Sequence, residues 1–194
     1  MAYNITLEGK NKVIAERMLR RVAGILEECA IDYWLEGGTL LGIRRENRLL
    51  PWDNDIDLSI NEDQLGKLEN FYSKLKNAGY RIRTRHFPYT NEYFSEGGIR
   101  MIKIREKRFF GLIKGPVCLD VFIKYQHNNN SYWEIDGKTK FVPSKFYRSF
   151  KEVEFKGYQY KIPALTDEYL TYRYGDWQKA VKNWDTSKDD NAIA

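Results

Sequence analysis

The chain has 194 residues, of which 42% are hydrophobic and 30% charged, and a formal net charge of +5 at pH 7. These values suit one domain with a packed core, and they exclude a membrane span, because no stretch approaches the roughly 18 consecutive apolar residues that a span needs. The two cysteines and two histidines are scattered, which excludes a disulfide framework and a zinc site, so any bound metal would have oxygen ligands.

The first half of the chain is expected to alternate helices and strands. Apolar residues at helical spacing predict a helix over residues 10–30, and a short strand follows at residues 33–35. A glycine turn at residues 37–38 opens a short helix, and residues 56–60 form a strand. Asn61 is the expected N-cap of a helix over residues 62–77, which is closed by Gly79.

The second half is expected to be richer in strands. Three are predicted over residues 80–86, 99–105 and 117–125, two shorter ones over residues 150–155 and 158–162, and a last helix over residues 166–174, ended by Gly175. The order lacks a steady βαβ rhythm, which favours an α/β (α+β) mixed sheet layered by helices over a doubly wound fold. We expect a single domain over residues 1–194, with the N-terminal helix at about 10–30, a core at about 31–126 and C-terminal strands and helices at about 127–194.

The strongest chemical signal is the pair Asp55 and Asp57. On a strand, residues i and i+2 project from the same face, so the two carboxylates repel each other beside apolar neighbours. A hard divalent cation, Mg²⁺ or Mn²⁺, relieves that repulsion, and it prefers such oxygen ligands. The alternative without a functional role is a polar turn whose Asp and Asn side chains form hydrogen bonds with the local backbone. The glycine turn upstream and the apolar flanks favour the metal site.

The glycine turn and a later aspartate complete the predicted site. Gly37, Gly38 and Thr39 give a backbone that a phosphate can approach closely, at the N-terminus of a helix with free N–H groups. Asp120 lies inside an otherwise apolar strand, where an ionised carboxylate needs a partner. Either it faces water at a strand edge, or it shares a metal with Asp55 and Asp57. We predict that the three carboxylates converge on one point.

Two stretches resemble the signature of the LicD family. They are residues 36–45, which run from Glu36 through the glycine turn to Arg45, and residues 50–58, which include both aspartates; residues 174–177 resemble the family's closing motif. The likeness extends from about residue 16 to residue 177. The LicD family includes bacterial phosphocholine transferases, is similar to the fukutin-related ribitol-phosphate transferases, and belongs to the DNA polymerase beta-like nucleotidyltransferase superfamily.

The resemblance implies a metal-dependent phosphotransferase. Its donor would be a CDP-activated alcohol such as CDP-choline, and its acceptor a cell-surface glycan or a lipid-linked glycan. Asp55 and Asp57 would hold Mg²⁺ against the donor diphosphate, while Asp120 would complete the site and take the proton of the acceptor. The glycine turn would cradle the donor phosphates.

Several further residues have two interpretations. Arg45 matches the motif arginine and either pairs with a phosphate or ends a helix in water. Lys103 either counters the diphosphate or belongs to a charged strand face. Asp53 is expected to support the site from a turn rather than to bind the metal. Residues 46–48 (Glu-Asn-Arg) depart from the His-Lys-Gly-like turn of the family, so they are candidates for setting the alcohol preference.

Three other functions compete with this one. A nucleotidyltransferase would keep the site but transfer an NMP from an NTP and release pyrophosphate. A sequence pI near 9.0 suggests a nucleic-acid-binding module, but the basic residues are interleaved with acidic ones, so we expect no nucleic acid. A nucleotide-binding pseudoenzyme is disfavoured by the intact carboxylates. Without a recognisable secretory signal we expect a cytoplasmic protein, and the basic residues are compatible with a peripheral contact at the inner face of the membrane.

Overall fold

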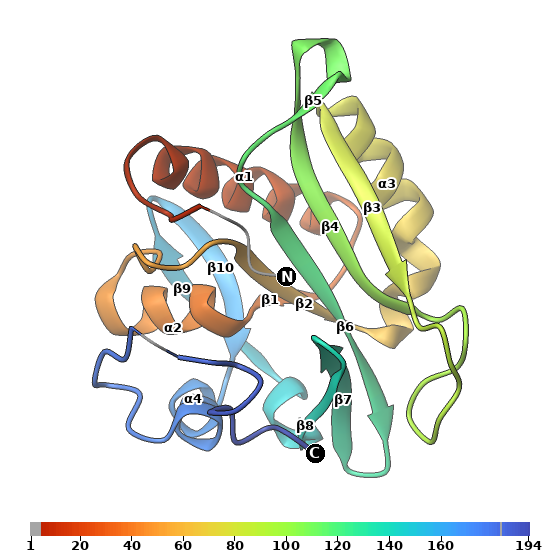
Figure 1. Ribbon diagram of the computed structural model, residues 1–194, viewed down its shortest axis with the longest axis vertical. Helices are drawn as coiled ribbons and strands as arrows, with labels where there is room; N and C mark the ends of the chain where they lie inside the picture. The colour runs from red at the N-terminus through yellow and green to blue at the C-terminus, as the bar shows by residue number, and fades with distance from the viewer. Residues whose placement is uncertain (1–4, 183) are drawn as a thin grey trace.

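A mixed sheet forms the centre of the fold (Figure 1). The computed structural model describes residues 5–182 and 184–194. Five strands lie side by side in the order β1 (Tyr33–Leu35), β2 (Ile56–Asn61), β6 (Leu119–His127), β4 (Ile99–Arg108) and β3 (Tyr80–His86). β2 and β6 run parallel, and the other neighbours run antiparallel. The expected mixed sheet layered by helices is confirmed.

Two helices cover one face of this sheet. α1 (Gly9–Glu28) and α3 (Leu68–Asn77) contact each other, and they pack on β6 and β3 respectively (Figure 1). α2 (Gly37–Glu46) contacts β2, and α4 (Thr166–Tyr174) contacts the second sheet. In the described part of the chain, none of the helices has the length and apolar character that a membrane span requires.

The remaining strands extend the fold beyond the central five. β5 (Ile113–Lys114) pairs with the end of β4, while β7 (Asn130–Ile135) pairs with β6 and with β8 (Lys138–Pro143). β9 (Phe150–Phe155) and β10 (Tyr158–Pro163) form a separate hairpin that lies against β1. β9 and β10 agree with the two short strands expected from the sequence, whereas β7 and β8 were not expected.

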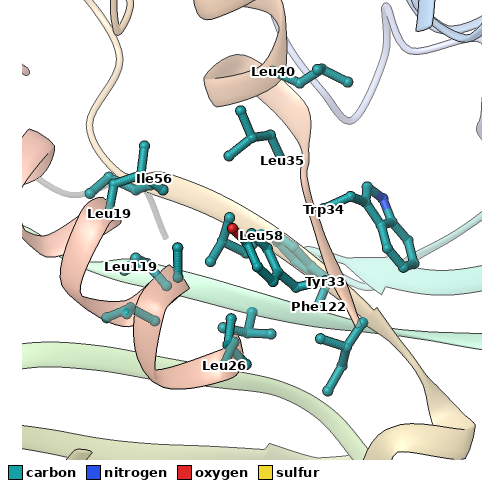
Figure 2. Close-up of a cluster of buried hydrophobic side chains, with 14 of the residues drawn as sticks. Leu19, Leu26, Tyr33, Trp34, Leu35, Leu40, Ile56, Leu58, Leu119 and Phe122 are labelled. Carbon is teal, nitrogen blue, oxygen red and sulfur yellow. The ribbon is translucent and has the colours of Figure 1, made fainter. Parts of the chain in front are cut away.

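The core explains why β2 and β6 are held firmly. Leu19 and Leu26 lie on the apolar face of α1 and point toward Leu58 of β2 and Leu119 of β6 (Figure 2). All four side chains are buried, so the helix removes a continuous apolar face of the sheet from water. Because side chains alternate along a strand, the residues on either side of Leu58 project from the opposite face of β2.

The predicted helix over residues 62–77 is two elements. A 3-10 helix spans Glu62–Lys67 and α3 follows it. Asn61 stands at the predicted N-cap position, but its side chain makes no cap hydrogen bond. The reason is that Asn61 is the last residue of β2, paired with Lys124 of β6, and the sheet fixes its orientation. Gly79 and Gly175 both have positive φ after α3 and α4, as their predicted places at helix ends require.

Candidate active site

One row of charged residues crosses four strands of the central sheet. The register pairs Asp57 of β2 with Asp120 of β6, Asp120 with Lys103 of β4, and Lys103 with Arg83 of β3. Residues paired in this way project from the same face. The row therefore runs from two carboxylates to two cations on the face of the sheet opposite α1 and α3.

The glycine turn closes over the carboxylate end of the row. The backbone N–H of Glu36 donates to the carbonyl of Asp57 at 3.1 Å, and the N–H of Asp57 donates to Thr39 Oγ1 at 2.9 Å. Gly37 has φ +56°, and a Cβ at Gly37 would overlap Asp57 Oδ2, while one at Gly38 would overlap an oxygen of Asp53. The positive φ of Gly37 favours glycine at that position, and with these Asp53 and Asp57 side-chain positions neither glycine has room for a Cβ.

The carboxylates of this cluster raise one another's pKa. Burial raises the pKa of Asp55 to about 8, with further contributions from Asp53 and Asp120. Burial, followed by the charges of Asp55, Asp53 and Asp120, holds the pKa of Asp57 well above its usual range. Burial also raises the pKa of Asp53 to about 6. These acids lack enough positive charge from the protein to ionise together at neutral pH.

Asp120 is engaged on both of its oxygens. It is 3% exposed; Lys103 Nζ donates to its Oδ2 at 2.5 Å, and the Cys118 thiol donates to its Oδ1 at 3.0 Å. Lys103 thus pairs with a carboxylate of the acidic cluster, a contact that neither interpretation from the sequence had included, and its predicted contact with the donor diphosphate stays a prediction. Cys118 and the other cysteine, Cys29, are both buried and free of disulfides.

The acidic cluster has the chemistry of a divalent-cation site. Its donors are carboxylate oxygens, and their mutual repulsion favours a hard cation such as Mg²⁺. Across residues 5–182 and 184–194, no three His, Cys, Asp or Glu side chains already have metal-binding geometry. Sharing one ion among Asp55, Asp57 and Asp120 would therefore require side-chain rotation. The metal role of these residues stays a prediction.

A cationic wall faces the cleft beside the acids. The cleft has a volume of about 1580 Å³, and both the acidic cluster and the basic side chains of β3 and β4 line it. Arg81 lies directly opposite Arg105, and Arg83 directly opposite Lys103. Like charges placed opposite each other destabilise a sheet. Within the described residues, Arg81, Arg83 and Arg85 have no ion pair with an acid, so the wall is suited to an anionic ligand.

Arg45 lines the same cleft, but its guanidinium is already engaged. Nε and one terminal nitrogen bind Glu46, the shorter contact being 2.6 Å, and the other terminal nitrogen donates to the carbonyl of Trp177 at 3.1 Å. Glu46 also accepts from Arg48. Two of the three residues that depart from the family pattern thus form an ion cluster with Arg45. A phosphate would have to displace Glu46 to bind Arg45 bidentately, so that role stays a prediction.

A buried charge network that was not predicted from the sequence lies next to the glycine turn. Glu36 is 2% exposed and accepts hydrogen bonds from the Arg173 guanidinium at 2.8 Å and from Ser59 Oγ at 3.0 Å, and Lys124 Nζ lies 3.2 Å from it. Burial favours the neutral acid, but Lys124 and Arg173 hold the pKa of Glu36 at about 2. Burial lowers the pKa of Lys124 to about 7. Lys124 was visible as a lone charge in the apolar strand of Asp120, and that signal was overlooked.

The comparisons with known proteins match most of the chain to one family. Residues 30–165 match the family model described as "LicD/FKTN/FKRP, nucleotidyltransferase domain". Over 159 residues the chain is 27% identical to the ribitol 5-phosphate transferase FKRP of Mus musculus, covering 80% of this chain and 30% of that protein. It is 27% identical over 118 residues to the lipopolysaccharide cholinephosphotransferase LicD of Haemophilus influenzae, covering 59% of this chain and 43% of that protein.

The chain spans less than half the length of these two curated relatives. Among solved structures, it is similar to ANT(2")-Ia in complex with adenylyl-2"-tobramycin, with a TM-score of 0.45 and 17% sequence identity. That match covers 88% of this chain and 81% of the other. The residues matched by the family model include the glycine turn and all the aspartates of the acidic cluster.

Proposed function

Because this chain belongs to the LicD/FKTN/FKRP nucleotidyltransferase-domain family, we propose that it is a metal-dependent phosphotransferase. Its donor is a CDP-activated alcohol such as CDP-choline, and its acceptor is a hydroxyl of a glycan or lipid-linked glycan. The names of two relatives, a ribitol 5-phosphate transferase and a cholinephosphotransferase, support the transfer of a phosphorylated alcohol.

The observation that carries the proposal is the charged row Asp57, Asp120, Lys103, Arg83. A phosphotransferase needs a carboxylate cluster to bind its cation. It also needs a cationic surface to balance the negative charge of a phosphate that has left water. In this chain the two lie next to each other across adjacent strands. A nucleic-acid-binding module would need the cationic wall but would have no use for buried, mutually repelling acids.

The residues that would hold the cation are Asp55 and Asp57, together with Asp120. A bound Mg²⁺ or Mn²⁺ would offset negative charge on the donor diphosphate and on the transferred phosphoryl group. The first turn of α2, which begins at Gly37, presents N–H groups without intrahelical acceptors to the same region. The N–H of Gly37 itself donates to Glu36 Oε1 at 3.1 Å, so a phosphate would meet the N–H groups that follow it. Lys103 and Arg83 continue this surface toward β3 and would meet phosphate oxygens farther along the cleft.

The chemical step exchanges one phosphorus–oxygen bond for another. The acceptor hydroxyl oxygen attacks the phosphorus that carries the alcohol, and a new phosphorus–oxygen bond forms. The bond from that phosphorus to the bridging oxygen of the diphosphate breaks, and CMP leaves with the electron pair. The hydroxyl proton passes to Asp120; Lys103 and Cys118 each contact one of its oxygens, and a carboxylate oxygen has a second lone pair that can take the proton.

A donor panel tests this function. The full chain is incubated with Mg²⁺ and CDP-choline, CDP-ribitol, CDP-glycerol, CTP or ATP, and both thermal shift and products are measured. The proposal predicts stabilisation by at least one CDP-alcohol and CMP as the released nucleotide when an acceptor glycan is supplied. If only CTP or ATP binds and pyrophosphate appears, the chain is a nucleotidyltransferase that uses the same acids.

A further inference from the structure

An apolar tip projects from the sheet where β4 turns into β5. We call residues 107–114 the finger; in Figure 1 it extends past the end of α3 at the top of the molecule. Phe109 is 71% exposed, Phe110 is fully exposed, Leu112 is 84% exposed and Ile113 is 51% exposed. Of the eight large hydrophobic side chains that are exposed in the described part of the chain, these four lie within five residues.

The backbone holds the aromatic rings outward at an energetic cost. Phe109 has φ 48° and Phe110 has φ 55°, both in the left-handed region that residues with a Cβ avoid. A glycine follows only at position 111. A strained backbone that exposes apolar side chains to water does not stabilise the folded chain. Such segments are typical of surfaces that contact a binding partner.

The base of the finger is basic. Lys107 pairs with Lys114 across the β4–β5 ladder, and Arg108 pairs with Ile113. Farther down the same sheet Arg81 lies opposite Arg105. The base also contains an acid, since Glu106 lies 3.9 Å from the Arg108 guanidinium, but Lys107, Arg108 and Lys114 leave it with a net positive charge. Apolar side chains at a tip above such a base complement an anionic lipid surface, in which acyl chains lie beneath negative headgroups.

A second copy of the chain fits the finger less well. Four side chains bury far less than the roughly 1,200–2,000 Å² of a stable protein interface. The basic base would also face another chain of net charge +5. An anionic bilayer avoids both problems. Its charge is opposite to that of the basic base, and a small apolar tip can insert into it without a large matching interface.

We propose that the finger docks this protein on an anionic lipid bilayer. Phe109, Phe110, Leu112 and Ile113 enter the boundary between headgroups and acyl chains, while Lys107, Arg108 and Lys114 meet the headgroup phosphates. Leu112, Ile113 and Lys114 also line the cleft that contains the acidic cluster, so docking brings the cleft to the lipid surface. This orientation favours a lipid-linked acceptor, a consequence that rests on the proposed function; the docking itself does not.

Vesicle sedimentation of the full chain tests the docking. We expect binding to vesicles of phosphatidylcholine mixed with phosphatidylglycerol, and much weaker binding to phosphatidylcholine alone. Phe109→Ser with Phe110→Ser should lower the apparent vesicle affinity by about tenfold or more. Arg108→Gln with Lys114→Gln should lower it by about fivefold for each charge removed, and added salt should lower it further.

The matched control is Val13→Ser. Val13 lies on α1, away from the finger, and is 62% exposed. Its substitution therefore removes an exposed apolar side chain outside the finger, and vesicle binding should not change. Thermal unfolding should confirm that all variants keep the fold. The docking is overturned if the wild type does not sediment with anionic vesicles, if the Phe variant binds them as well as the wild type, or if the finger instead mediates dimers that the Phe variant dissolves.

The donor assay separates this inference from the proposed function. Stabilisation by CDP-alcohols, measured without vesicles, should be equal in the wild type and in the variant with Phe109→Ser and Phe110→Ser, because neither ring lines the cleft. Vesicle binding without donor binding would contradict the phosphotransferase and leave the docking standing. Donor binding and turnover without vesicle binding would contradict the docking and leave the phosphotransferase standing.

Discussion

Two buried clusters of charge lie next to each other around the start of α2, and they are balanced in opposite ways. In the first, Glu36, Arg173 and Asp190 are joined by Lys124 and Lys140, so that acids and bases alternate; Arg173 Nη1 lies 2.8 Å from Glu36 and Lys140 Nζ lies 2.6 Å from Asp190. In the second, burial and the charges of Asp53 and Asp120 raise the pKa values of Asp55 and Asp57, and the lysine Lys103 pairs with Asp120.

The pKa values express this difference. Glu36 is held at a pKa of about 2 by two cations despite its burial, whereas burial and neighbouring acids raise the pKa of Asp55 to about 8. A carboxylate whose charge the chain itself balances is part of the architecture. One whose charge is left unbalanced in a cleft is suited to a ligand that brings positive charge. The predictions below test that distinction.

The largest expected effect comes from breaking the balanced cluster. Arg173→Met leaves Glu36 and Asp190 buried without their shared cation, and we expect a loss of about 3–5 kcal/mol in the free energy of unfolding. Urea denaturation measures it. The control is Arg44→Met, which breaks the exposed ion pair with Asp167 and should cost less than about 1 kcal/mol. Equal losses in the two variants would show that the buried network contributes no more to the free energy of unfolding than an exposed ion pair does.

Neutralising one acid in the unbalanced cluster should affect activity and stability in opposite directions. Asp57→Asn removes a charge without changing volume, so we expect turnover to fall by about 10²–10³-fold or more. In metal-free buffer the melting temperature should stay the same or rise, because carboxylate repulsion is relieved. Asp63→Asn, in the 3-10 helix, is the control and should change neither quantity. A variant that loses both activity and stability would contradict the assignment of Asp57 to a ligand site.

The unbalanced cluster should also make stability depend on pH. The folded pKa of Asp55 is about 8, above the usual value of 3.8, so the folded protein holds a proton that the unfolded chain releases. This contribution is complete below about pH 4 and is lost as the pH rises toward 8. Melting temperatures in EDTA should therefore fall between about pH 4.5 and pH 7, below the range in which Lys124 contributes.

Two comparisons sharpen that pH test. Saturating Mg²⁺ should flatten the profile, because the cation replaces the proton as the source of positive charge. Asp57→Asn should make it shallower without added metal. A profile that is flat in EDTA, or one that Mg²⁺ does not change, would remove the electrostatic argument for the acidic cluster.

The smallest expected effect is at the cationic wall. Arg83→Gln should raise the KM for the donor by about tenfold and leave kcat nearly unchanged, because Arg83 meets phosphate oxygens rather than the reacting bond. Stability should not fall, since the substitution relieves repulsion with Lys103 across the β3–β4 ladder. Lys76→Gln, on α3 behind the sheet, is the matched loss of charge and should leave KM unchanged. A larger effect on kcat than on KM would place Arg83 at the chemical step instead.

Local patterns in the sequence were enough to predict the acids and the glycine turn. Asp55 immediately precedes β2, yet it lines the same cleft as Asp57, as the i, i+2 spacing suggested, and Asp120 was conspicuous in an apolar strand. The fold class followed from the order of helices and strands, and the mixed sheet confirmed it. The acidic side chains were nominated as ligands, and their metal role remains to be tested by experiment.

Long-range pairing could not be predicted in the same way. The charged row depends on the parallel register of β2 with β6, which joins residues far apart in the chain, and a shift of one residue would turn Asp120 to the other face. The partners of Glu36 come from β6 and α4, so no local pattern reveals its charge balance. β7 and β8 were missed because their aromatic and charged residues follow no clear alternation.

Calorimetric titration of Mg²⁺ into the metal-free protein tests most directly whether the acidic cluster binds a divalent cation. We predict a saturable site in the wild type and its loss in Asp57→Asn, with Asp63→Asn unchanged. Because the pKa of Asp55 is about 8, binding at pH 7 should also release protons, seen as heats that vary with the ionisation enthalpy of the buffer. No saturable binding, or equal binding in the wild type and Asp57→Asn, would contradict the account.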